Sequence, residues 1–134
     1  MILYESPVIR LDFAPSTDIL TADLSGVHEF YLLEVREALR TIVDNVRHYD
    51  VKRLLMDSRK RILQIDSDTY RALMIDFAHE LNSTRLQKFA RMRSGVASRE
   101  DIATYIQDHV AATFSFKTFA DKELALEWLK SGQT

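Results

Sequence analysis

Cysteine is absent from this chain, so disulfide bonds, thiolate metal ligands and a cysteine nucleophile are all excluded. Glycine and proline are scarce, with three and two residues respectively in a chain of 134. Flexible linkers and low-complexity tracts are usually rich in these residue types. Their scarcity, together with a length typical of one domain, predicts a single domain over residues 1–134.

Long hydrophobic runs are missing as well. No run approaches the roughly 20 apolar residues that a helix needs to span a bilayer. The first residues, Met1 to Glu5, lack the basic region and the longer apolar region of a secretion signal. We therefore expect a cytoplasmic protein without an integral membrane segment.

An excess of one charge sign is also lacking, since the formal net charge is −2 at pH 7. Such a balance gives no general attraction to nucleic acid or to an anionic membrane. We therefore expect no nucleic-acid partner.

The motifs of common catalytic and cofactor-binding sites are not present. The chain has no glycine-rich phosphate loop, no G-x-S-x-G turn and no dinucleotide-binding fingerprint. Its four histidines lack the spacing of metal ligands: His28, His48, His79 and His109. We expect no metal site, no cofactor and no enzymatic activity.

What the chain does have is a high hydrophobic content, 46%, arranged in alternating periods. Two short β-prone runs, residues 8–13 and 19–24, flank a turn at Pro15 and predict an antiparallel pair near the N-terminus. Apolar residues at helical spacing then predict a helix of roughly twenty residues. They are Leu32, Val35, Leu39, Ile42 and Val46.

Strand and helix patterns alternate over the rest of the chain. Residues 51–56, 86–92 and 113–117 read as strands. Each of these strands is followed by a predicted helix. The apolar positions that mark the three helices are Tyr70, Leu73, Met74, Phe77 and Leu81 for the first, Ile102, Ile106 and Val110 for the second, and Leu124, Ala125, Trp128 and Leu129 for the third. Ser98 and Asp121 are the predicted caps of the last two. The sequence thus predicts an α/β fold whose mixed sheet has parallel later strands and packs with about four helices.

One passage carries a family resemblance. The apolar strand ends at Asp57, and a loop leads to Ile65-Asp66-Ser67 at the start of a helix. This passage and the C-terminal residues 116–129 resemble the STAS domain, the sulfate-transporter and anti-sigma-factor-antagonist module, in its small single-domain sporulation-antagonist-like branch. The similarity runs from about residue 18 to residue 129. The sequence departs from the family pattern in a loop one residue longer and in a missing glycine, near Thr69.

The resemblance implies a non-catalytic regulatory or protein-interaction module with a STAS-like fold and a protein partner. It also implies that Ser67 is the residue that accepts a phosphate from a partner kinase. A phosphate there would lie at a helix N-terminus, where backbone amides and the helix dipole favour an anion. The residues themselves leave another interpretation open, in which Ser67, beside Asp66, only caps the helix.

Positive charges cluster near this passage. Exit loops of neighbouring parallel strands emerge at one sheet edge, so two groups of cations could meet there. We expect a partner-binding or anion-binding site built from Asp57, Ser58, Arg59, Lys60, Arg61, Asp66, Arg93 and Arg99. The alternative is that Arg59, Lys60 and Arg61 form an ordinary solvated loop.

A different class of function is suggested by the aromatic residues. STAS-like domains are similar in fold to the lipid-carrying CRAL-TRIO proteins, which implies a carrier or sensor of a small apolar or lipid-like ligand. Residues that could line such a pocket are Phe13, Phe30, Phe77, Phe89, Phe114, Phe116, Phe119 and Trp128. A closely packed core would leave no cavity larger than a water molecule, so a cavity separates the two interpretations.

The start of the long helix suggests a third possibility. Phe30, Tyr31 and Leu33 make this segment apolar over more than one face. They could pack against a second copy of the chain, and a homodimer is therefore also considered.

Overall fold

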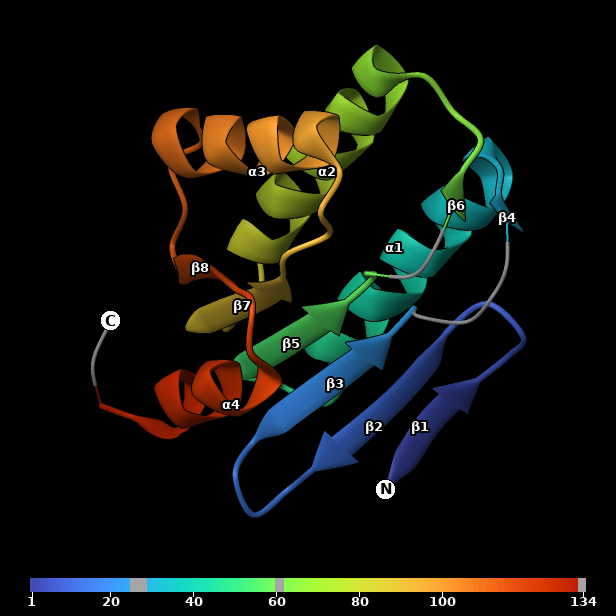
Figure 1. The fold of residues 1–134 in the computed structure, drawn as a ribbon. Coiled ribbons are helices and arrows are strands. Elements are labelled where there is room, and N and C mark those ends of the chain that lie inside the picture. Colours follow the sequence, from blue (N-terminus) through green and yellow to red (C-terminus); the bar gives the residue numbers. More distant parts are fainter. Residues whose placement is uncertain (25–28, 60–61, 133–134) are drawn as a thin grey trace.

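A six-stranded mixed sheet forms the centre of the computed structural model, which describes residues 1–24, 29–59 and 62–132 (Figure 1). The strand order is β1-β2-β3-β5-β7-β8. Their bounds are β1 Ile2–Glu5, β2 Arg10–Ala14, β3 Ile19–Asp23, β5 Arg53–Asp57, β7 Lys88–Met92 and β8 Ser115–Phe119. Two further strands, β4 Glu29–Phe30 and β6 Ile62–Leu63, form a separate parallel pair.

The sheet changes direction at β3. Strands β1, β2 and β3 are antiparallel neighbours, whereas β3, β5, β7 and β8 are parallel. This confirms the α/β class and the mixed sheet that the sequence predicted. Strand β1 adds a third antiparallel strand that the pattern did not show, because three of its four residues are exposed at the sheet edge.

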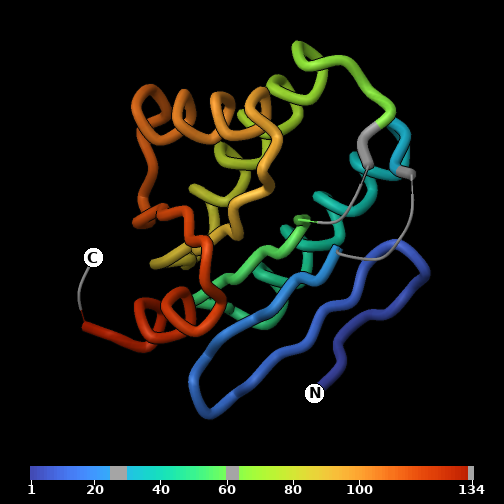
Figure 2. The backbone as a smooth tube through the Cα atoms, viewed as in Figure 1, coloured from blue at the N-terminus to red at the C-terminus, as the bar shows by residue number. Residues whose placement is uncertain are grey.

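Four helices cover the sheet unequally. Helices α1 Leu32–His48, α2 Ser67–Asn82 and α3 Ala97–His109 lie on one face, and α4 Lys122–Lys130 lies alone on the other (Figures 1 and 2). Helix α1 buries four of the five residues of the predicted stripe, Val35, Leu39, Ile42 and Val46, whereas Leu32 at its first position is exposed. The layout of four helices and one mixed sheet agrees with the sequence prediction.

The helix starts agree with the sequence in one case and not in another. Asp121 caps α4 as predicted, because its carboxylate accepts from the Glu123 amide at 2.8 Å. The prediction that Ser98 caps α3 was wrong, since the residue before the helix is Val96 and Ser98 lies inside the first turn. An N-cap residue must have extended backbone angles, and here Val96 has them.

Alternation along the strands sends neighbouring residues into two cores. Leu54 and Met56 of β5 pack in the main core under α1, α2 and α3, whereas Leu55 packs in the smaller core under α4. Lys88 of β7 connects the sheet to the end of α4 by hydrogen bonds. Its ammonium donates to the carbonyls of Trp128 at 2.8 Å and Ser131 at 2.6 Å. Burial lowers the pKa of Lys88.

Candidate functional site

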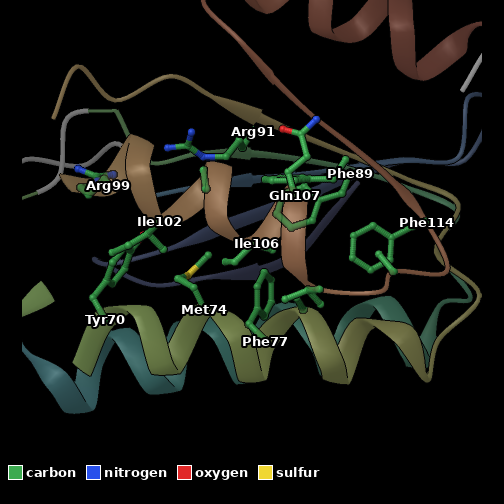
Figure 3. Close-up of a pocket in the computed structure, with 15 residues that line it drawn as sticks. Tyr70, Met74, Phe77, Phe89, Arg91, Arg99, Ile102, Ile106, Gln107 and Phe114 are labelled. Carbon is green, nitrogen blue, oxygen red and sulfur yellow. The ribbon is translucent and has the colours of Figure 1, made fainter. Parts of the chain in front are cut away.

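A cavity of about 220 Å³ lies between α2, α3 and the β7–β8 end of the sheet (Figure 3). We call it the α2–α3 pocket. Most of its lining is apolar or aromatic: Tyr70, Met74, Phe77, Ala78, Phe89, Ile102, Ala103, Ile106, Val110, Ala112, Phe114 and Phe116. Arg91, Arg99 and Gln107 complete it.

The helical and strand periods explain why these residues meet. On α2, Tyr70, Met74 and Phe77 lie at spacings of four and three, which places them on one face of the helix. Phe89 and Arg91 are two apart on β7 and therefore share the face beneath α3. Ala103 on α3 and Ala78 on α2 have short side chains at facing positions, so they leave room that larger residues would fill.

Half of the aromatic residues proposed for a ligand pocket come together here. The Phe89 ring is 5.9 Å from Phe77, 6.1 Å from Phe114 and 5.0 Å from Phe116, measured between ring centroids. The other four do not line the pocket. Phe13 and Phe30 are buried elsewhere in the main core, while Phe119 of β8 and Trp128 of α4 pack on each other in the smaller core.

Arg91, a buried residue of the pocket lining, forms an ion pair with the partly buried Glu100 outside the lining. Arg91 donates through Nη1 and Nη2 to the two carboxylate oxygens of Glu100, both at 2.8 Å, and through Nη1 to Thr118 at 3.2 Å. Ser94 adds its amide at 3.1 Å and its hydroxyl at 2.7 Å to the same carboxylate. The hydrogen bonds from Arg91, followed by those from Ser94, lower the pKa of Glu100 to about 2, against the opposing effect of burial.

Sequence reasoning did not find this pair. The two residues lie on different elements, nine positions apart, so no local pattern connects them. The available signal was Arg91 itself, a charged residue between the apolar residues Ala90 and Met92 of a buried strand. Such residues need a partner in the fold.

The segment after β5 holds several of the predicted site residues. The Arg59 guanidinium donates to both oxygens of Asp57, at 3.0 and 2.8 Å. Burial raises the pKa of Asp57, but the hydrogen bonds from Arg59 outweigh it and the pKa lies below its usual value. Arg99 of α3 donates to the carbonyl and the hydroxyl of Ser58, at 2.9 and 3.0 Å.

In the structure Asp57 is paired with Arg59, and Ser58 accepts hydrogen bonds from Arg99. These residues do not form an open basic surface. Arg99 is buried, and Arg59 is paired with a carboxylate. Arg93 lies on the wall of an open hollow between α3 and β8 that Lys117 and Thr118 also line. Lys60 and Arg61 are outside the described residues.

Asp66 and Ser67 have separate roles at the start of α2. Asp66 is the cap, because its carboxylate accepts from the amide and the hydroxyl of Thr69, each at 2.8 Å. These hydrogen bonds lower the pKa of Asp66. Ser67 is the first residue of the helix and is exposed. The interpretation in which Ser67 itself caps α2 was therefore wrong.

The apolar segment considered for self-association is divided by the fold. Phe30 lies in β4 and is fully buried, so it cannot contact a second copy. Tyr31 and Leu33 are 54% and 63% exposed. They remain the apolar surface at the start of α1.

The described residues, 1–24, 29–59 and 62–132, contain no group of three side chains suited to hold a metal ion. Among the helices they form, none combines the length and hydrophobicity of a membrane-spanning segment. Comparison of the chain with known proteins gave no matching family model, no matching curated protein and no matching solved structure.

Proposed function

We propose that this chain is a non-catalytic module that binds a small, largely apolar molecule in the α2–α3 pocket. The observation that carries this proposal is the cavity of about 220 Å³. Protein interiors are packed so closely that voids larger than a water molecule are few. An engineered apolar cavity of about 150 Å³ is already large enough to bind benzene.

The chemistry of the pocket favours binding. Among the described residues that line it, the charged ones are Arg91 and Arg99, and arginine keeps its proton under ordinary conditions. Such residues can orient a ligand but are poor at taking a proton from it. Tyr70 is the only hydroxyl-bearing side chain in the lining, and it is 6% exposed. This lining suits a carrier or sensor.

Filling the pocket is expected to abolish uptake of an apolar probe. Toluene titrated into the wild-type chain should cause saturable NMR shifts of the methyl groups of Met74, Ile102 and Ile106. Ala78→Leu should weaken this binding at least tenfold, because the added carbons point into the pocket from α2. Ala72→Leu on the same helix is the matched control, since Ala72 is exposed and should leave binding unchanged. If wild-type methyl shifts do not saturate, the pocket does not bind apolar molecules.

A second candidate function rests on the position of Ser67. We infer that the chain also acts as a regulatory interaction module, like an anti-sigma-factor antagonist, switched by phosphorylation of Ser67. The exposed position of this residue at the first turn of α2 supports the inference, as does the resemblance of residues 57–74 to the STAS domain. A phosphate there would be stabilised by the helix dipole and would change the charge of a docking surface.

Substitution of Ser67 separates this switch from a merely structural role. Ser67→Asp is expected to weaken binding to a co-purifying partner at least tenfold, whereas Ser67→Ala should bind like the wild type. Because Asp66 supplies the cap, Ser67→Ala should change the free energy of unfolding by less than about 0.5 kcal/mol. Ser98→Asp, at another exposed position in a first helical turn, is the control. Affinity by titration calorimetry that is equal for all forms would exclude the switch.

A further inference from the structure

The α2–α3 pocket has a polar end within apolar walls. Arg91 and Arg99 bring two positive charges to its lining, and none of the described residues that line it is acidic. Both arginines are buried, with 7% and 6% of their surface exposed. Figure 3 shows Tyr70 and Arg99 at one end of the pocket and Phe114 at the other. The Arg99 end of the pocket is therefore more polar than the Phe114 end, and Arg91, which is paired with Glu100, lies between the two ends.

Arg91 lines the pocket and keeps hydrogen-bonding capacity beyond its contacts to Glu100 and Thr118. A guanidinium has five N–H groups, and the contacts to Glu100 and Thr118 use three of them. Glu100 does not line the pocket, and Ser94 also donates to its carboxylate. The pair thus fixes the Arg91 side chain in one position, which lowers the entropy cost of binding a further acceptor.

We propose that the ligand of this pocket is a small carboxylate with an apolar body, and that Arg91 binds its carboxylate. This inference rests on the proposed function and names the ligand class. A carboxylate is the acceptor that best matches paired N–H donors of an arginine. The apolar body would lie along Met74, Ile106 and Phe89, which form the walls beyond Arg91.

The cavity volume limits the size of the apolar body. At about 220 Å³ it exceeds the cavity that holds benzene, about 150 Å³, but is smaller than the roughly 300–1,000 Å³ of sites for drug-sized ligands. A six-membered ring with a two- or three-carbon acid chain, or a linear acid of similar volume, fits this limit. A lipid with two acyl chains does not.

The position of Gln107 indicates where such a molecule enters. Gln107 is exposed and lines both the α2–α3 pocket and the open hollow between α3 and β8. Lys117 and Arg93 line the same hollow. Glu100 lines this hollow too, but its carboxylate is already paired with Arg91. The two cations therefore outnumber the one carboxylate in the described lining, which favours the approach of an anion.

Two probes with the same body and different ends test the proposal. We expect 3-phenylpropionate to bind the wild-type chain at least tenfold more tightly than 3-phenylpropan-1-ol, measured by NMR titration of the Met74 and Ile106 methyl groups at pH 7. In the double variant Arg91→Met, Glu100→Gln the preference for the acid over the alcohol should fall to threefold or less. Removing both charges avoids leaving one of them buried without its partner.

The outcomes distinguish the ligand class from the pocket itself. Equal affinity for the acid and the alcohol in the wild type would overturn the carboxylate assignment while leaving the apolar pocket in place. A preference for the acid that persists in the double variant would overturn the role of Arg91. If neither probe binds and toluene does not bind either, the proposed function fails along with this inference. If the double variant does not fold, the affinities of the wild type for the acid and the alcohol still test the carboxylate assignment.

Discussion

Replacing Phe89 with alanine is expected to lower the free energy of unfolding by about 3–5 kcal/mol. Phe89 is 4% exposed on the interior strand β7, between β5 and β8, and contacts the rings of Phe77, Phe114 and Phe116. These rings come from a helix, a loop and the neighbouring strand, so truncation removes contacts to three segments together. Urea unfolding followed by far-ultraviolet circular dichroism measures the loss.

The loss of unfolding free energy in Phe89→Ala depends on whether neighbouring side chains can move into the space that the ring leaves. A void left by Phe89 would join the existing α2–α3 pocket, so we expect little collapse and a value in the upper part of that range. Phe89→Leu is the control, because it keeps most of the volume and should lose much less. A loss below about 1 kcal/mol for Phe89→Ala would contradict the packing of this wall.

Replacing Glu100 with alanine is expected to cost about 3 kcal/mol at pH 7, since it leaves the Arg91 guanidinium buried without its carboxylate. The double variant Arg91→Met, Glu100→Gln should recover at least half of this loss, because neither charge is then left alone. Denaturant midpoints for the three proteins give the comparison. Equal losses for the single and double variants would show that the ion pair itself, and not the orphaned charge, matters for stability.

The same pair predicts a dependence of stability on pH. The pKa of Glu100 is about 2 in the folded chain, compared with an ordinary value of 4.5. A depressed folded pKa means that the stabilisation is complete above about 4.5 and is lost progressively as the pH falls toward about 2. Asp57 and Asp66 also have lowered pKa values and act in the same direction. The test therefore compares the pH dependence of stability of the wild type with that of a variant that lacks the Glu100 carboxylate.

The variant that isolates this contribution is Glu100→Gln. Its stability should fall less steeply than that of the wild type between pH 4.5 and pH 2, as measured by thermal unfolding at several pH values. Glu127→Gln, on the exposed side of α4, provides a control with one carboxylate removed elsewhere. Parallel curves for the wild type and Glu100→Gln would contradict the charge pairing described for Arg91.

Hydrophobic periods made much of the fold predictable. The stripe on α1 and the compact run of β5 have strong periods, and both elements form where the sequence places them. Short elements were not predictable. Strands β4 and β6 have two residues each, and β1 is largely exposed, so none of them carries a clear period.

The candidate site was predictable only in part. Phe89, Phe114 and Phe116 were identified as possible pocket residues by their aromatic type, but their grouping depends on the pairing of β7 with β8. The contacts made by individual cations were not predictable, because local sequence cannot say which of them find partners in the fold. Arg59 folds back on Asp57, two residues away, and Arg99 reaches Ser58 across 41 positions.

By itself, the sequence determined which faces of the helices and strands are apolar, because side-chain direction follows fixed periods of 3.6 and 2 residues. It also determined the α/β class and the order of the main elements. Only the tertiary structure decided that a cavity stays open between α2 and α3, and that Arg91 is held there by Glu100. A cavity is the volume left when elements distant in the sequence pack together, and the small side chains at Ala78 and Ala103 acquire that meaning only once their helices face each other.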